Sequence, residues 1–407
     1  MPRRFAGLAL VAVLLGVLVA LGLVARLLVE TGRELTLPAP TGPYAVGRTS
    51  QTWTDDGATD EFAAAPGTPR ELVAWLWYPA VPASGPPADY LPRAWRQAFA
   101  DATTFPLAKL VTLDPSRVRA HAMRDAALSS SRPTWPIVLL RAGSSALTTE
   151  YTTLAEDLAS HGYVVVGIDA PFRTFAVVLP DGRSVARLPA NDPEAVTGDA
   201  QVALATRLMQ GWVRDLRFTV DRLAHLNAAG AGPFAGHLDL DAIGVVGHSL
   251  GGATAAQFCH DDGRCRAGVD LDGRPFGTVV TEGLRQPFLV LLSDHGSTDA
   301  TESGILADLR AIERHQAPGA AGGLLMIRGA NHFSFGDQIL RRSPMAMGLL
   351  RATGVLPLEP RRGLAVAAGY VRRFLDVQLK RADPGVLQAA RGEYPEVIAL
   401  PGLAGGG

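Results

Sequence analysis

The sequence predicts an α/β fold in which helices cover both faces of a mostly parallel sheet, with a transmembrane helix ahead of it. Short runs rich in Val, Ile and Leu alternate along the chain with longer helix-forming stretches. These runs are continuously apolar, as expected for strands that are buried on both faces. An unbroken apolar segment follows Arg3 and Arg4 and is long enough to cross a bilayer.

The order of the predicted elements favours parallel pairing. The predicted strands are residues 72–78, 137–140, 163–168, 242–246, 266–271, 287–292 and 324–327. The predicted helices lie near residues 151–160, 201–226, 252–258, 303–315 and 361–379. A helix between two strands returns the chain to the end of the sheet where the first strand began, so the two strands run in parallel.

The composition is that of a globular catalytic domain. The 407 residues are 47% hydrophobic, which is enough to bury a large core. The 38 basic and 39 acidic residues leave a formal net charge of −1. Nothing in this balance favours a nucleic acid or a polyanion as a partner.

The most informative motif is the pentapeptide GHSLG at residues 247–251, which directly follows the apolar run at 242–246. A buried strand that ends in G-x-S-x-G is typical of a nucleophile elbow, where the serine sits on a sharp strand-to-helix turn. Small residues let the backbone pass closely there, and Gly252 and Ala253 continue that pattern. The motif and the βαβ order predict the α/β-hydrolase fold and make Ser249 the candidate nucleophile.

The general base is expected late in the chain, in a loop at the carboxyl end of a strand. Among the histidines that follow Ser249, His332 lies in the loop after the predicted strand at 324–327. We therefore predict that His332 is the base. His315 ends a predicted helix, and His295 flanks a competing acid.

The acid of the triad has two candidates by topology. Asp272 and Asp294 each follow the carboxyl end of a predicted strand. Either carboxylate can hold the histidine tautomer and stabilise its cation, provided that its loop reaches His332 Nδ1. Asp270 is a third candidate, although a structural role at the strand end is the simpler interpretation.

Four segments resemble the plasma and intracellular type II platelet-activating-factor acetylhydrolases and their bacterial lipase-like relatives. The segments are residues 136–169, the elbow GHSLGGAT where the family has GHSFGGAT, the run Val269-Asp270-Leu271-Asp272-Gly273, and residues 327–335. The resemblance spans about residues 70–380. It implies the triad Ser249, Asp272 and His332, and leaves Asp294 as the alternative acid.

Two backbone N–H groups are expected to form an oxyanion hole. Leu250 supplies the first, because it follows the nucleophile. The second belongs to the loop after the predicted strand at 137–140, and the resemblance assigns it to Ser144. The chain has Ala142 where the family has a histidine, which leaves the backbone donors in place but alters the shape of the loop.

The N-terminal segment at residues 5–25 is expected to be a membrane anchor. It is longer than the about 7–15 apolar residues of a typical secretory signal, although a cleaved signal peptide remains the alternative. The positive-inside rule keeps Arg3 and Arg4 in the cytoplasm and the rest of the chain outside it. We therefore expect a single-pass protein of a bacterial cell membrane, or a secreted protein if the segment is cleaved.

The only two cysteines agree with a location outside the cytoplasm. Cys259 and Cys265 flank a turn-rich loop that is able to bring them within disulfide distance. Two free thiols are one alternative. A metal site that adds His260 and Asp261 is another, although the spacing matches no zinc motif well.

The expected organisation has four parts. An anchor or signal at 1–30 precedes an extracytoplasmic spacer at 31–70, which is rich in Pro, Gly and Thr. The catalytic domain occupies 71–383, and a tail occupies 384–407. Residues 172–199 are either a cap over the site or an ordinary surface loop.

The expected reaction is hydrolysis of a carboxylic ester by acyl transfer, which requires no metal or organic cofactor. The resemblance implies a short-acyl ester or the sn-2 ester of a phospholipid. A general lipase or esterase, a polyester hydrolase and a peptidase would use the same residues. A catalytically inactive, membrane-tethered binding module is the alternative from another class.

Overall fold

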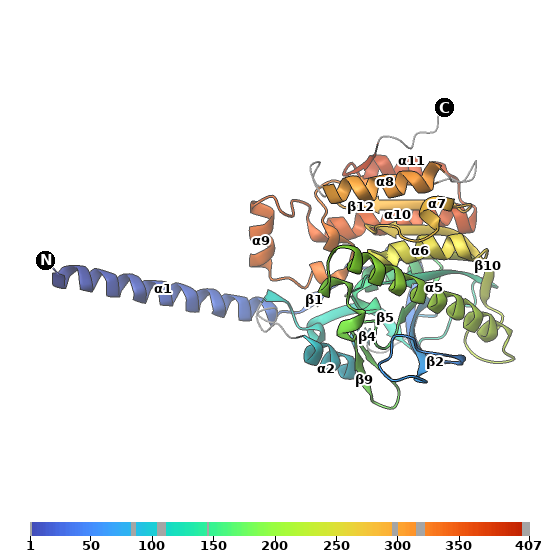
Figure 1. Cartoon of the computed structure of the whole chain (residues 1–407), viewed down its shortest axis with the longest axis horizontal. Helices are drawn as coiled ribbons and strands as arrows, with labels where there is room; N and C mark the ends of the chain where they lie inside the picture. The colour runs from blue at the N-terminus through green and yellow to red at the C-terminus, as the bar shows by residue number, and fades with distance from the viewer. Residues whose placement is uncertain are drawn as a thin grey trace.

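The structure is a computed structural model that describes residues 2–82, 87–103, 111–144, 146–294, 300–314 and 322–400. A mixed, mostly parallel sheet forms the centre of the molecule, and the long helix α1 (Pro2–Thr31) projects away from it (Figure 1). The predicted fold class is confirmed. His295, His315 and residues 401–407 lie outside the described part of the chain.

The sheet has the strand order β1-β5-β2-β3-β7-β6-β10-β11-β12-β13-β14, with β4 paired to β5. Its parallel centre runs from β7 to β13. The bounds of these strands are β6 Trp135–Arg141, β7 Val164–Asp169, β10 Leu238–His248, β11 Cys265–Leu271, β12 Phe288–Leu292 and β13 Gly323–Ile327. Each overlaps one of the strands predicted from an apolar run, and β7 and β12 begin one residue later than predicted.

Helices cover both faces of this parallel centre, and an apolar core lies between the sheet and the helices on each face. Side chains of α4 (Thr152–Ser160) and α10 (Pro360–Lys380) belong to one core. Side chains of α5 (Gly198–Ala228), α6 (Leu250–Asp261) and α8 (Ala300–Arg314) belong to the other. The other α-helices in the described part of the chain are α2 Arg93–Ala102, α7 Val279–Glu282, α9 Pro344–Ala352 and α11 Gly385–Glu393.

The prediction of an irregular spacer at residues 31–70 is wrong. Strand β2 (Ala45–Thr59) lies there and pairs with β3 (Pro69–Ala80) in an antiparallel hairpin. Val46 and Trp53 of β2 are buried, and its Thr-rich sequence suits a half-exposed strand. The Pro and Gly residues that suggested a spacer lie mainly before β2 and in the turn after it. The sheet therefore begins well before residue 71.

The tail expected at residues 384–407 is also structured up to residue 400. It contains α11 and β14 (Val397–Ala399), and β14 pairs antiparallel with β13. Arg362 of α10 forms an ion pair with Glu396 just before β14, at 2.7 Å. The last strand of the sheet thus lies beyond the predicted domain boundary. The short strands at the other edge are β1 Leu35–Thr36, β4 Pro87–Asp89 and β5 Val118–Arg124.

Helix α1 is fixed to the catalytic body at its C-terminal end. The carboxylate of Glu30 accepts hydrogen bonds from Ser343 Oγ at 2.7 Å and from the backbone N–H of Met345 at 3.0 Å, at the start of α9. Residues Val13–Thr31 are long and apolar enough to cross a membrane, by length and composition, and their side chains are mostly exposed. A signal sequence meets the same criteria.

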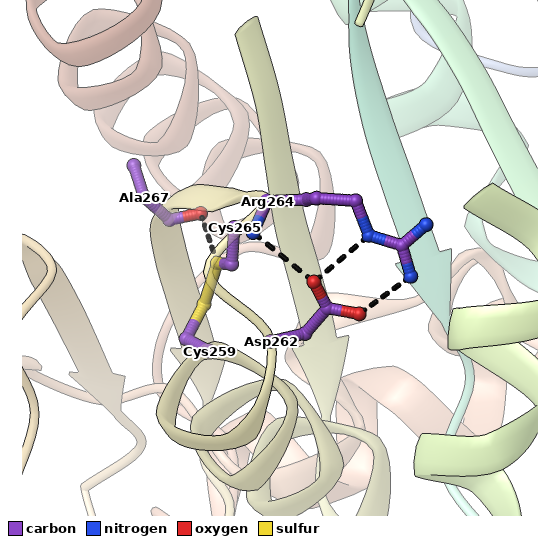
Figure 2. Close-up of a disulfide and its surroundings, with 5 residues drawn as sticks. All are labelled: Cys259, Asp262, Arg264, Cys265 and Ala267. Atoms are coloured by element: carbon purple, nitrogen blue, oxygen red, sulfur yellow. Dashed lines mark hydrogen bonds and ion pairs between the residues drawn. A yellow bond between two sulfur atoms is a disulfide. The ribbon is translucent and has the colours of Figure 1, made fainter. Parts of the chain in front are cut away.

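The structure joins Cys259 and Cys265 by a disulfide (Figure 2). The bond connects the last turn of α6 to the start of β11. Between them, Asp262 accepts hydrogen bonds from the backbone and the guanidinium of Arg264. The two cysteines are therefore neither free thiols nor metal ligands in this structure.

We expect the double variant C259A/C265A to lose about 2 kcal/mol of unfolding free energy, because the unfolded chain regains the entropy of an open loop. Urea unfolding of the variant and of the wild type under non-reducing conditions measures the difference. Wild-type protein in a reducing buffer should show the same loss. Equal stability of all three samples would contradict a stabilising disulfide.

Candidate active site

Ser249 sits on the sharp turn between β10 and α6. Its backbone has φ 57° and ψ −125°, a conformation that residues with a side chain rarely adopt. A Cβ atom added to Gly247 would lie 1.9 Å from the carbonyl oxygen of Gly251, and one added to Gly251 would lie 2.3 Å from the carbonyl oxygen of Arg141. Only glycine fits at these two positions. The turn therefore has the geometry of a nucleophile elbow.

Asp272 and His332 form a close pair. His332 Nδ1 lies 2.6 Å from Asp272 Oδ2. Because a carboxylate only accepts, Nδ1 carries the proton and Nε2 is left as an acceptor. Ser293 also donates to Asp272, from its backbone N–H at 2.7 Å and from its hydroxyl at 2.8 Å. The Asp272 side chain is fully buried, whereas that of His332 is 37% exposed.

The parallel sheet brings this pair to the elbow. Ser249, Asp272 and His332 follow the carboxyl ends of β10, β11 and β13, which meet at one edge of the sheet. The ring of His332 packs against that of His248, beside Ser249, with 4.5 Å between ring centroids.

Asp294, the alternative acid, contacts the loop before His332. Its Oδ2 accepts a hydrogen bond from the backbone N–H of Gly329 at 2.9 Å, and its own N–H donates to the carbonyl of Ala330 at 2.9 Å. These contacts give Asp294 a role in holding the loop. The structure brings His332 to Asp272 rather than to Asp294.

Asp270, the third candidate, lies behind the elbow helix. Its Oδ1 accepts a hydrogen bond from the backbone N–H of Gly273 at 2.7 Å. A Cβ atom on Gly252 would lie 1.8 Å from the same oxygen, so the carboxyl group packs directly against α6. Burial, with a smaller effect of the Asp272 charge, raises the pKa of Asp270 to about 8.

The predicted oxyanion donors lie on both sides of Ser249. Leu250 is the first residue of α6, so its N–H belongs to the positive end of the helix dipole. The loop after β6 passes over the elbow, since a Cβ atom on Gly143 would lie 3.3 Å from Ser249 Cβ. Ser144 is the next residue of that loop.

The segment at 172–197 contacts the same loop. It contains the hairpin of β8 (Ala176–Val178) and β9 (Ser184–Ala186) and two short 3₁₀ helices. Arg187 Nη1 donates to the Ser144 carbonyl at 2.9 Å, and Ser144 Oγ donates to Glu194 Oε1 at 2.9 Å. Of the two expectations for this segment, a cap beside the site agrees with these contacts.

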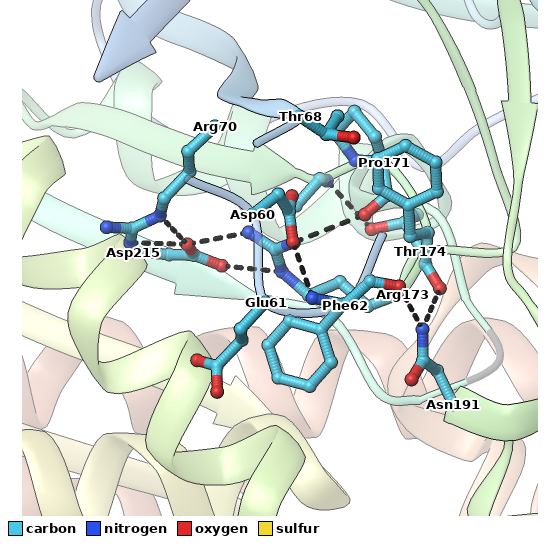
Figure 3. Close-up of polar contacts among 12 residues, drawn as sticks. Asp60, Glu61, Phe62, Thr68, Arg70, Pro171, Arg173, Thr174, Asn191 and Asp215 are labelled. Carbon is cyan, nitrogen blue, oxygen red and sulfur yellow. Dashed lines mark hydrogen bonds and ion pairs between the residues drawn. The ribbon is translucent and has the colours of Figure 1, made fainter. Parts of the chain in front are cut away.

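A buried ionic network fixes the base of this segment (Figure 3). Arg173 donates to Asp60 at 2.6 Å and to Asp215 of α5 at 2.9 Å, and Asp215 also pairs with Arg70 at 2.7 Å. Burial alone would raise the pKa of Asp215, but the charges of Arg173 and Arg70 lower it to about 2. Asn191 donates to the carbonyl of Phe62 at 2.8 Å. The segment is therefore held to the turn between β2 and β3 and to α5.

Two side chains near the elbow were not predicted from the sequence. Tyr151 ends the 3₁₀ helix at Thr148–Tyr151, and its hydroxyl lies 2.7 Å from His248 Nδ1. His248 Nε2 lies 2.8 Å from the backbone carbonyl of His332. A histidine inside the elbow motif is the one signal in the sequence that pointed here.

A metal centre finds no support in the described part of the chain, where no group of three or more His, Cys, Asp or Glu side chains is placed to hold an ion.

The raised pKa of Asp270 predicts a pH-dependent stability. The folded state retains a proton up to about pH 8 that the unfolded chain loses near pH 3.8, so Asp270 lowers the stability as the pH rises through that window. D270N mimics the protonated acid and should remove this component. Urea unfolding at several pH values between these limits should show a stability gap between D270N and wild type that grows towards high pH, and a constant gap would contradict the buried acid.

The comparisons with known proteins agree on one family. A family model for platelet-activating factor acetylhydrolase, isoform II, matches residues 30–171 and 230–382, well over half of the chain. A probable 1-alkyl-2-acetylglycerophosphocholine esterase of Arthroderma benhamiae is 28% identical over 65% of this chain and 66% of its own length. A platelet-activating factor acetylhydrolase of Cavia porcellus is 23% identical over 77% of this chain and 71% of its own.

A solved structure has the same fold. The ferulic acid esterase from Streptomyces cinnamoneus superposes with a TM-score of 0.72 and is 27% identical, covering 91% of this chain and 99% of its own.

Proposed function

Because the chain belongs to the platelet-activating factor acetylhydrolase isoform II family, it is a carboxylic-ester hydrolase, and we propose that it works through Ser249, His332 and Asp272 on short-acyl esters. The observation that carries this assignment is the 2.6 Å contact between His332 Nδ1 and the buried carboxylate of Asp272, next to a serine on a strained turn.

The mechanism is acyl transfer. His332 Nε2 removes the proton of Ser249 as its Oγ attacks the ester carbonyl carbon. The N–H groups of Leu250 and Ser144 stabilise the oxyanion that forms. The tetrahedral intermediate then expels the alcohol, which takes the proton from His332. Water then attacks the acyl-enzyme in the same way, with His332 again as the base, and the carboxylic acid is released.

Asp272 stabilises the imidazolium form of His332 without taking its proton. The two donors from Ser293 supply hydrogen bonds to both oxygens of this buried carboxylate. They also fix its orientation, so that one oxygen points at His332 Nδ1.

For the substrate, we propose a short-acyl ester such as a phospholipid with a short sn-2 chain. The names of the two relatives support this class. The apolar helix α1 supports a location at a membrane, with the catalytic domain on the far side from Arg3 and Arg4. A general lipase or esterase, a polyester hydrolase and a peptidase remain alternatives within the same chemistry, and an inactive binding module remains the alternative from another class.

The triad assignment is tested by three variants assayed with p-nitrophenyl acetate. S249A should lose turnover, and D272N should lower kcat by about 10⁴-fold because the His332 tautomer is no longer fixed. D294N is the matched control. Its kcat should fall by less than about tenfold, since Asp294 holds the loop before His332 and does not contact His332 itself. A loss in D294N as large as in D272N would move the acid to Asp294. Wild-type turnover no faster than that of S249A would favour the binding module.

The substrate class is tested by the dependence of kcat/KM on chain length. p-Nitrophenyl acetate, butyrate and palmitate should be hydrolysed with decreasing efficiency, and platelet-activating factor should be cleaved at its acetyl ester. A preference for palmitate would indicate a lipase. Faster cleavage of ethyl ferulate than of either acetyl ester would align the protein with its structural neighbour instead.

The contact between the cap segment and the oxyanion loop predicts an effect of Arg187. R187Q removes the charged donor to the Ser144 carbonyl and should lower kcat by about tenfold, with a smaller change in KM. R183Q is the matched control, because Arg183 lies on the same segment but pairs with Asp181 and Glu71. Equal rates for R187Q and R183Q would show that Arg187 does not position the loop.

A further inference from the structure

We propose that Tyr151 and His248 form a positioning bridge that joins the oxyanion loop to the general base, an inference that rests on the proposed function. The bridge runs from the N–H of Gly143 through the Tyr151 hydroxyl and the His248 ring to the backbone carbonyl of His332. It connects the loop of the proposed oxyanion donor to the proposed base, two groups that must act together on one tetrahedral intermediate.

The base end of the bridge determines its polarity. The carbonyl of His332 only accepts, so His248 Nε2 must donate across the 2.8 Å contact. Nδ1 of the same neutral ring is then an acceptor, and the Tyr151 hydroxyl donates to it across 2.7 Å. One tautomer therefore satisfies both contacts.

The other end holds the oxyanion loop. The Tyr151 oxygen accepts a longer hydrogen bond, at 3.4 Å, from the N–H of Gly143. Gly143 lies directly over Ser249 and precedes Ser144, the proposed second oxyanion donor. Tyr151 itself is fixed, since it is 1% exposed and belongs to the 3₁₀ helix that leads into α4. The loop is thus held at Gly143 by Tyr151 and at Ser144 by Arg187 of the cap segment.

The environment of His248 keeps the bridge uncharged. Burial, followed by the nearby charge of His332, lowers the pKa of His248 to about 3. Its ring packs between those of His332 and Phe335, at 4.5 and 5.8 Å between centroids. A neutral ring in this place packs against the imidazolium of His332 without opposing its charge. Asp272 and His332 are the charged partners that face it.

The bridge differs from simple packing because each of its bonds depends on a particular nitrogen. A ring that only filled space would be replaced equally well by side chains of similar size and polarity. A positioning role requires the donor at the Nε2 position for the base and the acceptor at the Nδ1 position for the loop. Replacing His248 by asparagine or by glutamine tests the two contacts separately. The amide group of asparagine reaches the Nδ1 position, and that of glutamine reaches the Nε2 position.

The test compares H248Q, H248N and Y151F with the wild type, using p-nitrophenyl acetate turnover, labelling of Ser249 by a fluorophosphonate probe and thermal unfolding. H248Q keeps the donor towards His332 and loses only the acceptor for Tyr151, so kcat should fall by no more than about threefold. H248N loses that donor, and kcat and the labelling rate should fall by about tenfold or more, with KM and Tm close to wild type. Y151F should lower kcat by about fivefold.

A double variant adds a check on the connection. Y151F and H248Q break the same bond, so combining them should cost no more than the larger single effect. H237Q, a substitution of a half-buried histidine that contacts the Pro133 carbonyl away from the elbow, is the control and should leave kcat and the labelling rate unchanged.

Equal kcat values for H248N and H248Q, additive losses in the double variant, or a loss of kcat that follows Tm would each overturn the bridge. If the wild type neither hydrolyses the ester nor takes up the probe, the proposed function itself fails. An active, labelled wild type with an equally active H248N would remove only the bridge.

Discussion

The conformation of Ser249 is the constraint on which the rest of the site depends. A serine at φ 57° requires a strand that stops abruptly and a helix that starts at once, with no side chains where the two backbones cross. Gly247 and Gly251 satisfy that requirement at the crossing, where any Cβ would overlap backbone atoms. The strained turn holds the hydroxyl at the edge of the sheet, where neighbouring loops supply the other groups.

The neighbouring loops are fixed by hydrogen bonds and ion pairs. Ser293 holds Asp272, the proposed acid, and Asp294 holds the loop that carries His332, the proposed base. Arg187 holds the Ser144 carbonyl from the cap segment, which the buried pairs of Arg173 fix to α5. The bonds to Asp272 and the ion pairs of Arg173 are buried, where a bond to a charged group is worth more than one at the surface. The order of the site thus comes from contacts outside the proposed triad.

The parallel centre of the sheet was predictable from the sequence, because each of its strands is a continuous apolar run. The hairpin of β2 and the last strand β14 were not, since β2 lies among turn residues and β14 is very short. Motif and strand order were enough to propose Ser249 and His332, but topology alone left Asp272 and Asp294 equal. Tyr151 was missed because a single buried tyrosine carries no spacing signal, and only the structure shows its contact with His248.

The central claim is that Ser249 carries the acyl group during turnover. The most direct measurement is rapid acid quenching during hydrolysis of p-nitrophenyl butyrate, followed by peptide mapping by mass spectrometry. The account predicts a butyryl group on the peptide that contains Ser249, and no adduct in S249A. A butyryl group on another residue, or steady turnover with the Ser249 peptide always unmodified, would contradict it.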